Sequence, residues 1–133
     1  MFRGIALYLT IYNLSTIEDT MSQLRQPLDN PAYMSLRERH KEKFKEILSE
    51  SLQVDFSHCY LRGFDMSEMS LNKVILKGAY LHSADLRGVD LSLHDLEGCS
   101  LHKAKISGVL FPQNISAEEI RLSIEYGTRL RLK

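Results

Sequence analysis

The sequence predicts a mainly β fold in which the chain winds as a stack of coils, and a five-residue repeat is the main reason. From Phe56 to Phe111 every fifth residue is large and apolar, without a break. A helix brings a side chain back to the same face after about 3.6 residues and a strand after about 2, so a period of five fits neither. The twelve residues, called centres below, are Phe56, Leu61, Met66, Leu71, Leu76, Leu81, Leu86, Leu91, Leu96, Leu101, Ile106 and Phe111.

A second inward position lies two residues before each centre. Eleven of these twelve residues are small or apolar, and the exception is His94. The other three residues of each five are mostly polar, and glycine stands two after the centre at 63, 78, 88, 98 and 108, which indicates a recurring turn. Short extended pieces joined by such corners and stacked about 4.8 Å apart form a solenoid, although the pattern leaves the number of corners open.

Length, charge and cysteine content restrict the class of protein. The chain has 133 residues, which suits one domain with a small appendage, and it carries 17 basic and 17 acidic residues. A balanced charge gives no global reason to expect a nucleic-acid or membrane partner. The two cysteines, Cys59 and Cys99, are both inward but have a coil between them, about 10 Å, so we expect free thiols in a reducing compartment rather than a disulfide.

The repeat resembles the pentapeptide-repeat family. The motif A-(D/N)-L-x-x occurs as "ADLRG" at 84–88, and close variants include "VDLSL", "HDLEG", "AYLHS", "CSLHK", "VDFSH" and "FDMSE". The resemblance covers residues 54–113 and implies a right-handed quadrilateral β-helix with four pentapeptides per coil. Twelve repeats then make about three coils.

The segments on either side of the repeat are expected to close its two ends, because an open β-helix exposes unpaired backbone. Residues 114–133 predict a capping helix that begins at Ser116, with Glu119 as its capping-box partner, and ends at Gly127. This tail is also similar to the C-terminal end of some bacterial pentapeptide-repeat proteins.

Residues 1–53 predict an N-terminal strand and a helical cap. Alternation over residues 5–12 favours a strand, with a signal or membrane segment and a poorly ordered end as the alternatives. A short helix is expected near 16–25. A longer helix is expected from Pro31 to about Leu52, with a buried stripe of Leu36, Phe44, Ile47, Leu48 and Leu52. Its run "RERHKEKFKE" has both signs of charge, which favours a solvated face over a basic binding patch.

One face of the predicted coil collects aromatic and basic side chains. Aromatic rings and arginine together are typical of protein interfaces, so this face is the candidate binding site, and the alternative is a surface ladder that only stabilises stacking. Two of its histidines could ligate a metal, but no third ligand is evident, so no metal site is expected. His94 is read as a core histidine bonded to a backbone carbonyl, with a ligand or switch role as the alternative. The candidate residues are Tyr60, Arg62, Tyr80, His82 and His102.

These patterns favour a protein that binds another protein and does not catalyse a reaction. The sequence has no P-loop, no G-x-S-x-G, no H-E-x-x-H and no CxxC, and a filled solenoid has no cleft, so we expect no enzyme activity and no cofactor. The resemblance offers two alternatives, a DNA mimic that acts on gyrase and a secreted effector. Residues 54–113 hold seven acids and six bases, too little net charge to imitate a duplex. We expect a cytoplasmic scaffold of unspecified partner and oligomeric state.

Overall fold

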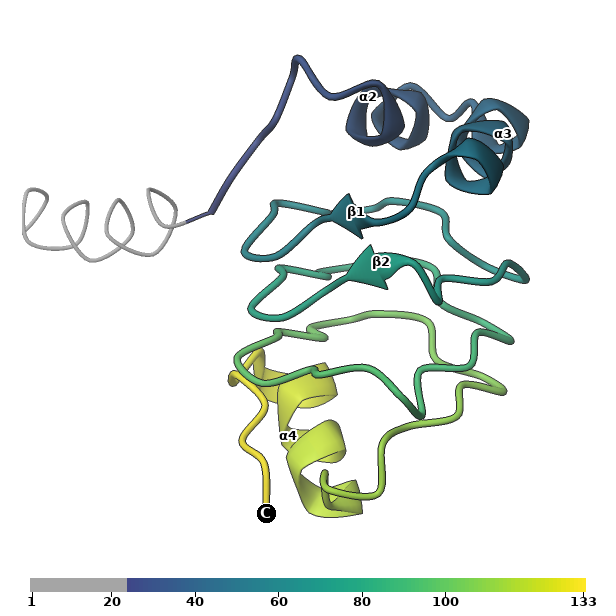
Figure 1. Cartoon of the computed structure of the whole chain (residues 1–133). Helices are drawn as coiled ribbons and strands as arrows, with labels where there is room; N and C mark the ends of the chain where they lie inside the picture. The colour runs from purple at the N-terminus through teal and green to yellow at the C-terminus, as the bar shows by residue number, and fades with distance from the viewer. Residues whose placement is uncertain (1–23) are drawn as a thin grey trace, which may run out of the picture.

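The computed structural model describes residues 24–133, which form a β-helix-type solenoid with helices at both ends (Figure 1). The strand expected over residues 5–12 and most of the short helix expected near 16–25 lie outside the described residues. The last residues of that expected helix are not helical. Arg25 instead forms a parallel bridge to Cys59, which adds one extended rung above the first coil. Among the helices of residues 24–133, none is long and apolar enough to cross a membrane.

Backbone pairing between coils has a constant register. The strand β1 (Val54–Asp55) pairs in parallel with β2 (Val74–Ile75), residue for residue at a separation of 20. Isolated bridges continue the same separation elsewhere in the repeat, for example Tyr60 with Tyr80 and Tyr80 with Ser100. Twenty residues are four pentapeptides, so each side chain lies directly beneath the residue four repeats earlier. The repeat therefore builds its surface as vertical columns.

The core consists of the inward residues that the five-residue period predicts. The first ten centres are all at most 1% exposed, from Phe56 to Leu101. Nine of the ten positions two before them are also buried, including Cys59, Ala79 and Cys99 at 0%, and the tenth, His94, is half-buried. The last inward residues, Ile106 and Phe111, are only half-buried. The predicted register is thus confirmed for the interior, and the core thins toward the C-terminal end.

Two backbone devices turn the corners. The aspartate that precedes many centres accepts a hydrogen bond from the N–H two residues on, at 2.9 Å from Ser57 to Asp55 and from Ser92 to Asp90. The residue two after the centre often has a positive φ, and glycine holds this position at Gly78 with φ 69°. A Cβ on Gly78 would meet the His58 ring in the coil above, so a larger residue here would have to displace that ring as well as adopt a disfavoured φ.

Over residues 31–50 the chain forms two helices where the sequence predicts one. Helix α2 (Pro31–Arg37) begins at Asn30, whose side chain accepts from the N–H of Tyr33, and α3 (Lys41–Glu50) follows it. The prediction of a single helix is wrong because Arg39 adopts a left-handed φ of 63° and ends the first helix. The predicted burial of Leu52 is also wrong. This residue is 99% exposed, since α3 ends at Glu50 and the chain turns toward β1.

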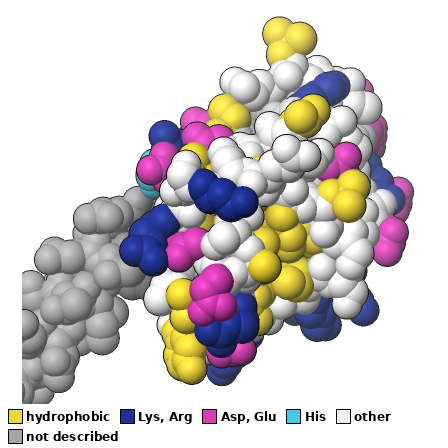
Figure 2. All heavy atoms as spheres, turned by 90° about the horizontal axis from the view of Figure 1, so that it is seen from below, with side chains coloured by type: hydrophobic (Ala, Val, Ile, Leu, Met, Phe, Trp, Pro, Cys, Tyr) yellow, Lys and Arg dark blue, Asp and Glu magenta, His cyan; other side chains and the backbone are white. Residues whose placement is uncertain are grey.

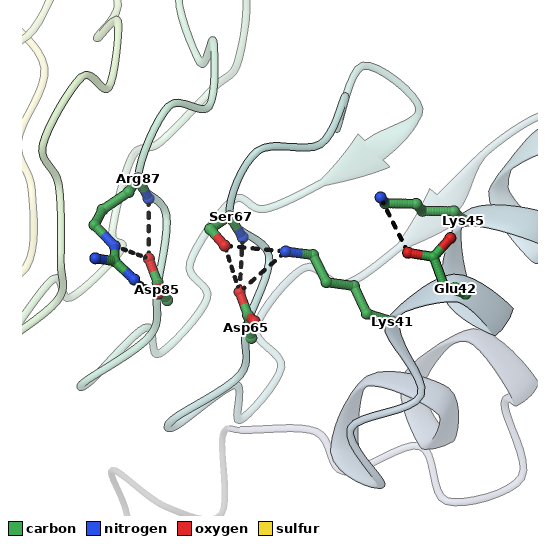
Figure 3. Close-up of polar contacts among 7 residues, drawn as sticks. All are labelled: Lys41, Glu42, Lys45, Asp65, Ser67, Asp85 and Arg87. Atoms are coloured by element: carbon green, nitrogen blue, oxygen red, sulfur yellow. Dashed lines mark hydrogen bonds and ion pairs between the residues drawn. The ribbon is translucent and has the colours of Figure 1, made fainter.

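Aromatic packing fixes the N-terminal cap on the first coil. The ring of Tyr33 lies 6.0 Å from Phe56 and 5.2 Å from Phe64, and Phe44 of α3 stacks on Phe56. Phe64 is large for an inward position, and in the first coil its ring packs against Tyr33 of the cap. Polar contacts add to this. Nζ of Lys41 in α3 points to Asp65 and to the hydroxyl of Ser67 at 3.0 Å (Figure 3).

The C-terminal cap is the predicted helix, α4 (Ala117–Tyr126). The hydroxyl of Ser116 accepts from the N–H of Glu119 at 3.1 Å, and Gly127 ends the helix at φ 77°, as expected. The carboxylate of Glu119 does not return to the N-cap as a capping box requires, because it pairs with Arg131 of the tail at 2.9 Å. Viewed from this end, hydrophobic side chains are exposed between charged ones (Figure 2). The cap therefore covers the last coil only in part, which agrees with half-buried Ile106 and Phe111.

Candidate protein-binding face

The candidate residues lie on one side of the repeat, which we call the tyrosine–histidine face and define as residues 59–63, 79–83 and 99–103. The tyrosines stand one residue before a centre and the basic residues one residue after it. Because the centres Leu61, Leu81 and Leu101 point into the core, their neighbours point outward. The 20-residue register then places Tyr60 directly above Tyr80. Sequence periodicity alone is sufficient to assemble this face.

The rings on this face form one continuous row. Tyr60 and Tyr80 stack with their centroids 5.5 Å apart and their planes 16° apart. Tyr80 stacks in turn on His82 at 5.7 Å, and His82 meets the edge of His102 at 4.9 Å. All four rings are half-buried, so each keeps part of its surface open to solvent. The structure therefore brings four of the five predicted residues into mutual contact.

Both caps contact the ends of this row. The Tyr33 hydroxyl of α2 donates a 2.6 Å hydrogen bond to the carbonyl of Tyr60. At the other end the His102 ring lies against Gly127, where an added Cβ would come within 3.3 Å of the imidazole. Ser100 also donates to the Gly127 carbonyl at 3.2 Å. The caps therefore hold the backbone at Tyr60 and the ring of His102, and stacking restrains the rings between them.

The tyrosine–histidine face is the one side of the repeat without a carboxylate. Its charged side chains are Arg62 and Lys103, whereas the acids of residues 54–113 all belong to the other three sides. Burial, with added repulsion from Arg62, His102 and Lys103, lowers the pKa of His82 below its ordinary value. The permanent positive charge of the face comes from Arg62 and Lys103. The acids are Asp55, Asp65, Glu68, Asp85, Asp90, Asp95 and Glu97.

The histidine and the two cysteines at inward positions of the repeat have structural roles. His94 bonds through Nε2 to the carbonyl of Leu71 at 2.9 Å, which confirms the prediction of a bonded core histidine, and within residues 24–133 its buried Nδ1 has no partner. Cys59 and Cys99 are buried free thiols, and burial raises their pKa values to about 11 and about 12. In the part of the chain that the structure describes, no three His, Cys, Asp or Glu residues could together hold a metal ion.

Among the hollows on the surface of residues 24–133, two lie at the edges of the N-terminal cap, and sequence reasoning did not anticipate them. A hollow of about 460 Å³ separates α3 from the first coil, between Leu48 and Met69. A second, of about 210 Å³, lies where α2 meets the tyrosine–histidine face and includes Arg37, Arg39 and Arg62. The expectation of a surface without a cleft is wrong here, because straight helices laid across a coil leave grooves at their edges. The run that contains Arg37 and Arg39 offered no signal beyond its charge.

Comparison with known proteins agrees with the geometry of the repeat. The model of the family described as "Pentapeptide repeats" matches residues 53–88 and 79–111, with eight copies. A pentapeptide repeat protein from the Arabidopsis thaliana thylakoid lumen is 34% identical over 47% of this chain and 47% of that one, with a TM-score of 0.23. The chain thus spans about half the length of that protein. No curated protein sequence matches this chain. With eight matched copies and the four-repeat register of its coils, the repeat segment of this chain belongs to the pentapeptide-repeat family.

Proposed function

We propose that this protein is a non-enzymatic scaffold that binds another protein through its tyrosine–histidine face. The observation that carries the proposal is the row of four stacked, half-buried rings from Tyr60 to His102. Aromatic side chains dominate the binding energy of protein interfaces, and rings already held in place lose little entropy when a partner docks. The face is also flat and regular because its backbone repeats every 20 residues.

The alternative reading is a ladder that stabilises stacking and does nothing else. Two features favour binding over that reading. A stabilising ladder needs no particular charge, yet this side lacks carboxylates while the other three sides share seven. The basic side chains Arg62 and Lys103 are both exposed, so they remain available to a partner. A surface that is aromatic at its centre and positive around it suits a protein partner of complementary charge.

The shape of the helix, the extent of its two caps and the location of the protein are part of the same proposal. A register of four pentapeptides supports a quadrilateral helix of about three coils over residues 54–113, and the resemblance to the pentapeptide-repeat family implies that it is right-handed. We assign residues 1–53 and 114–133 to its two caps. Two buried cysteines that remain free thiols suit a reducing compartment, so we propose a cytoplasmic location.

A double substitution tests the binding face. Tyr60→Ser with Tyr80→Ser removes the centre of the row, and Leu93→Ser with Leu110→Ser serves as the control because both leucines are exposed on the opposite side. Proteins captured by tagged wild-type and variant chains are compared by quantitative mass spectrometry, after melting curves show that all are folded. The proposal expects one partner to be lost with the tyrosine variant alone. Equal recovery of every partner by the tyrosine variant and the wild type would contradict the binding face, and the row would then be a ladder that only stabilises stacking.

A further inference from the structure

A positively charged pocket lies at the end of the tyrosine–histidine face nearest to the N-terminal cap. Its volume is about 210 Å³, and its lining includes the rings of Tyr33 and Tyr60. Tyr60 is also the first ring of the stacked row, so the pocket and the face are continuous. We call it the arginine pocket because its charged lining residues are Arg37, Arg39 and Arg62.

The three arginines come from two separate parts of the chain. Arg37 is the last residue of α2, and Arg39 follows two residues later in the break before α3. Arg62 belongs to the first coil, one residue after the centre Leu61. The Tyr33 hydroxyl, bonded to the carbonyl of Tyr60 at 2.6 Å, fastens α2 beside this coil. The pocket therefore exists only when the cap is docked on the repeat.

The backbone of Arg39 is strained. Its φ of 63° lies in the left-handed region, where a side chain is disfavoured and where glycine fits freely. A residue that ends a helix in this conformation is most often glycine. An arginine in this conformation indicates that its side chain has a function, because strained positions tend to cluster at functional sites.

The pocket arginines differ from every other arginine of residues 24–133. None of the three forms an ion pair or a side-chain hydrogen bond within that range, and no carboxylate of that range lines the pocket. Each of the other arginines of residues 24–133 has a defined partner. Arg25, Arg87, Arg121 and Arg131 pair with carboxylates, and Arg129 donates to the Gly98 carbonyl.

We propose that the arginine pocket binds the carboxylates of an acidic segment of the partner protein, which anchors that partner at one end of the tyrosine–histidine face. Guanidinium groups bind carboxylates through paired hydrogen bonds, and three that lack a partner within residues 24–133 in one small pocket suit a short cluster of Asp or Glu. A nucleic-acid backbone needs a long basic track. Below the pocket the face offers only Lys103 as a further permanent charge. The inference rests on the proposed protein-binding function and adds the chemistry of the partner.

The test uses hexaglutamate labelled with a fluorophore, whose binding to the full chain is followed by fluorescence anisotropy. Measurements at roughly 0.02 M and roughly 0.15 M salt show the electrostatic share, since screening shortens to about 8 Å at the higher value. Arg39→Gly removes one charge and also the left-handed strain. We expect affinity to fall about two- to fivefold, the range for an exposed charge pair, with no loss of thermal stability.

The matched control is Arg87→Gln, which changes the net charge equally but removes an arginine already paired with Asp85 on another side of the coil. Its affinity should equal that of the wild type. The triple variant Arg37→Gln, Arg39→Gly, Arg62→Gln should bind at least about tenfold more weakly if the charge contributions add.

Three outcomes would overturn the proposal. The first is that hexaglutamate does not bind to the wild type at the lower salt concentration. The second is an equal loss of affinity for Arg39→Gly and Arg87→Gln, which would show that only the net charge of the protein matters. Tighter, equally arginine-dependent binding of hexathymidylate would reassign the pocket to nucleic acid. These failures are separate from failure of the binding face. If hexaglutamate does not bind but the tyrosine variant still loses a partner, only the pocket is wrong.

Discussion

The hydroxyl of Ser123 in α4 accepts a hydrogen bond from the backbone N–H of Leu101 at 2.8 Å, in a junction where both residues are fully buried. In the coils above, the equivalent N–H groups of Leu61 and Leu81 donate to carbonyls of the next coil, those of Tyr80 and Ser100. Leu101 has no coil beneath it, so the serine hydroxyl replaces the missing carbonyl. The cap thus satisfies an edge that would otherwise be open.

Ser123→Ala should therefore destabilise the protein through an unpaired N–H. A buried donor without a partner costs about 1–3 kcal/mol of unfolding free energy. Urea denaturation gives this value directly, and Ser107→Ala, at an exposed corner of the last coil, is the control that should stay within about 0.5 kcal/mol of the wild type. Equal midpoints for the two variants would mean that Leu101 finds another acceptor.

Gly78→Ala should cost more stability than Gly63→Ala. Both glycines have left-handed φ values, 69° and 74°, so each substitution carries a penalty of about 1–2 kcal/mol. Only at Gly78 does the new methyl group meet the His58 ring, whose displacement adds about 0.5–1.5 kcal/mol. Adding His58→Ala to Gly78→Ala should remove this excess, which chemical denaturation can measure. If the excess persists without the ring, the contact is not its cause.

Leu91→Ala and Leu93→Ala compare the same chemical change two residues apart. Leu91 is 0% exposed and Leu93 is 96% exposed. The first substitution should lower the free energy of unfolding by about 2–5 kcal/mol because it leaves a cavity in a packed column. The second should change it by less than about 0.5 kcal/mol. Similar losses at both positions in thermal melts would contradict the inward register.

Asp90→Asn should make the fold less sensitive to acid. The Ser92 hydroxyl and N–H both bond to the Asp90 carboxylate and lower its pKa. A carboxylate with a lowered folded-state pKa stabilises the fold above its ordinary pKa, and that stabilisation is lost as the pH falls through the folded value. Asparagine keeps an acceptor for the corner but does not titrate. Between about pH 6 and pH 2.5 the variant should lose less thermal stability than the wild type, and parallel curves would argue against a role for this ionisation.

His82→Gln should alter the response to mild acid. Burial, with the positive charges of Arg62 and Lys103, holds the pKa of His82 below its ordinary value. The unfolded chain then takes up a proton at a higher pH than the folded chain, so falling pH favours unfolding. From about pH 7.5 to about pH 5 the wild type should lose more thermal stability than the glutamine variant. An identical pH dependence of the two melting temperatures would show that this imidazole does not titrate differently on folding.

The repeat could be predicted almost completely from the sequence, because its signal is redundant. Leu81, Leu86 and Leu91 each indicate the same inward register, so one irregular residue such as His94 does not obscure it. The register then places Tyr60 over Tyr80 without any knowledge of the caps.

The N-terminal cap was less predictable because its structure depends on contacts distant in the sequence. The break at Arg39 contains neither glycine nor proline, so no local residue marks it. The arginine pocket was missed for the same reason. Arg62 is 23 residues beyond Arg39, and only the docking of α2 through Tyr33 brings them to one hollow.

The constant separation of 20 residues between paired positions also limits how this molecule can change in length. Deletion of a single pentapeptide between them would move every later residue to the neighbouring side of the coil. Tyr80 would then no longer lie under Tyr60, and each side would carry charged residues that now belong to its neighbour. Loss or gain of a whole coil leaves each column aligned and both caps on their usual contacts. Insertions and deletions within the repeat are therefore conservative only in steps of four pentapeptides, and the number of such steps sets how long a partner the tyrosine–histidine face can accommodate.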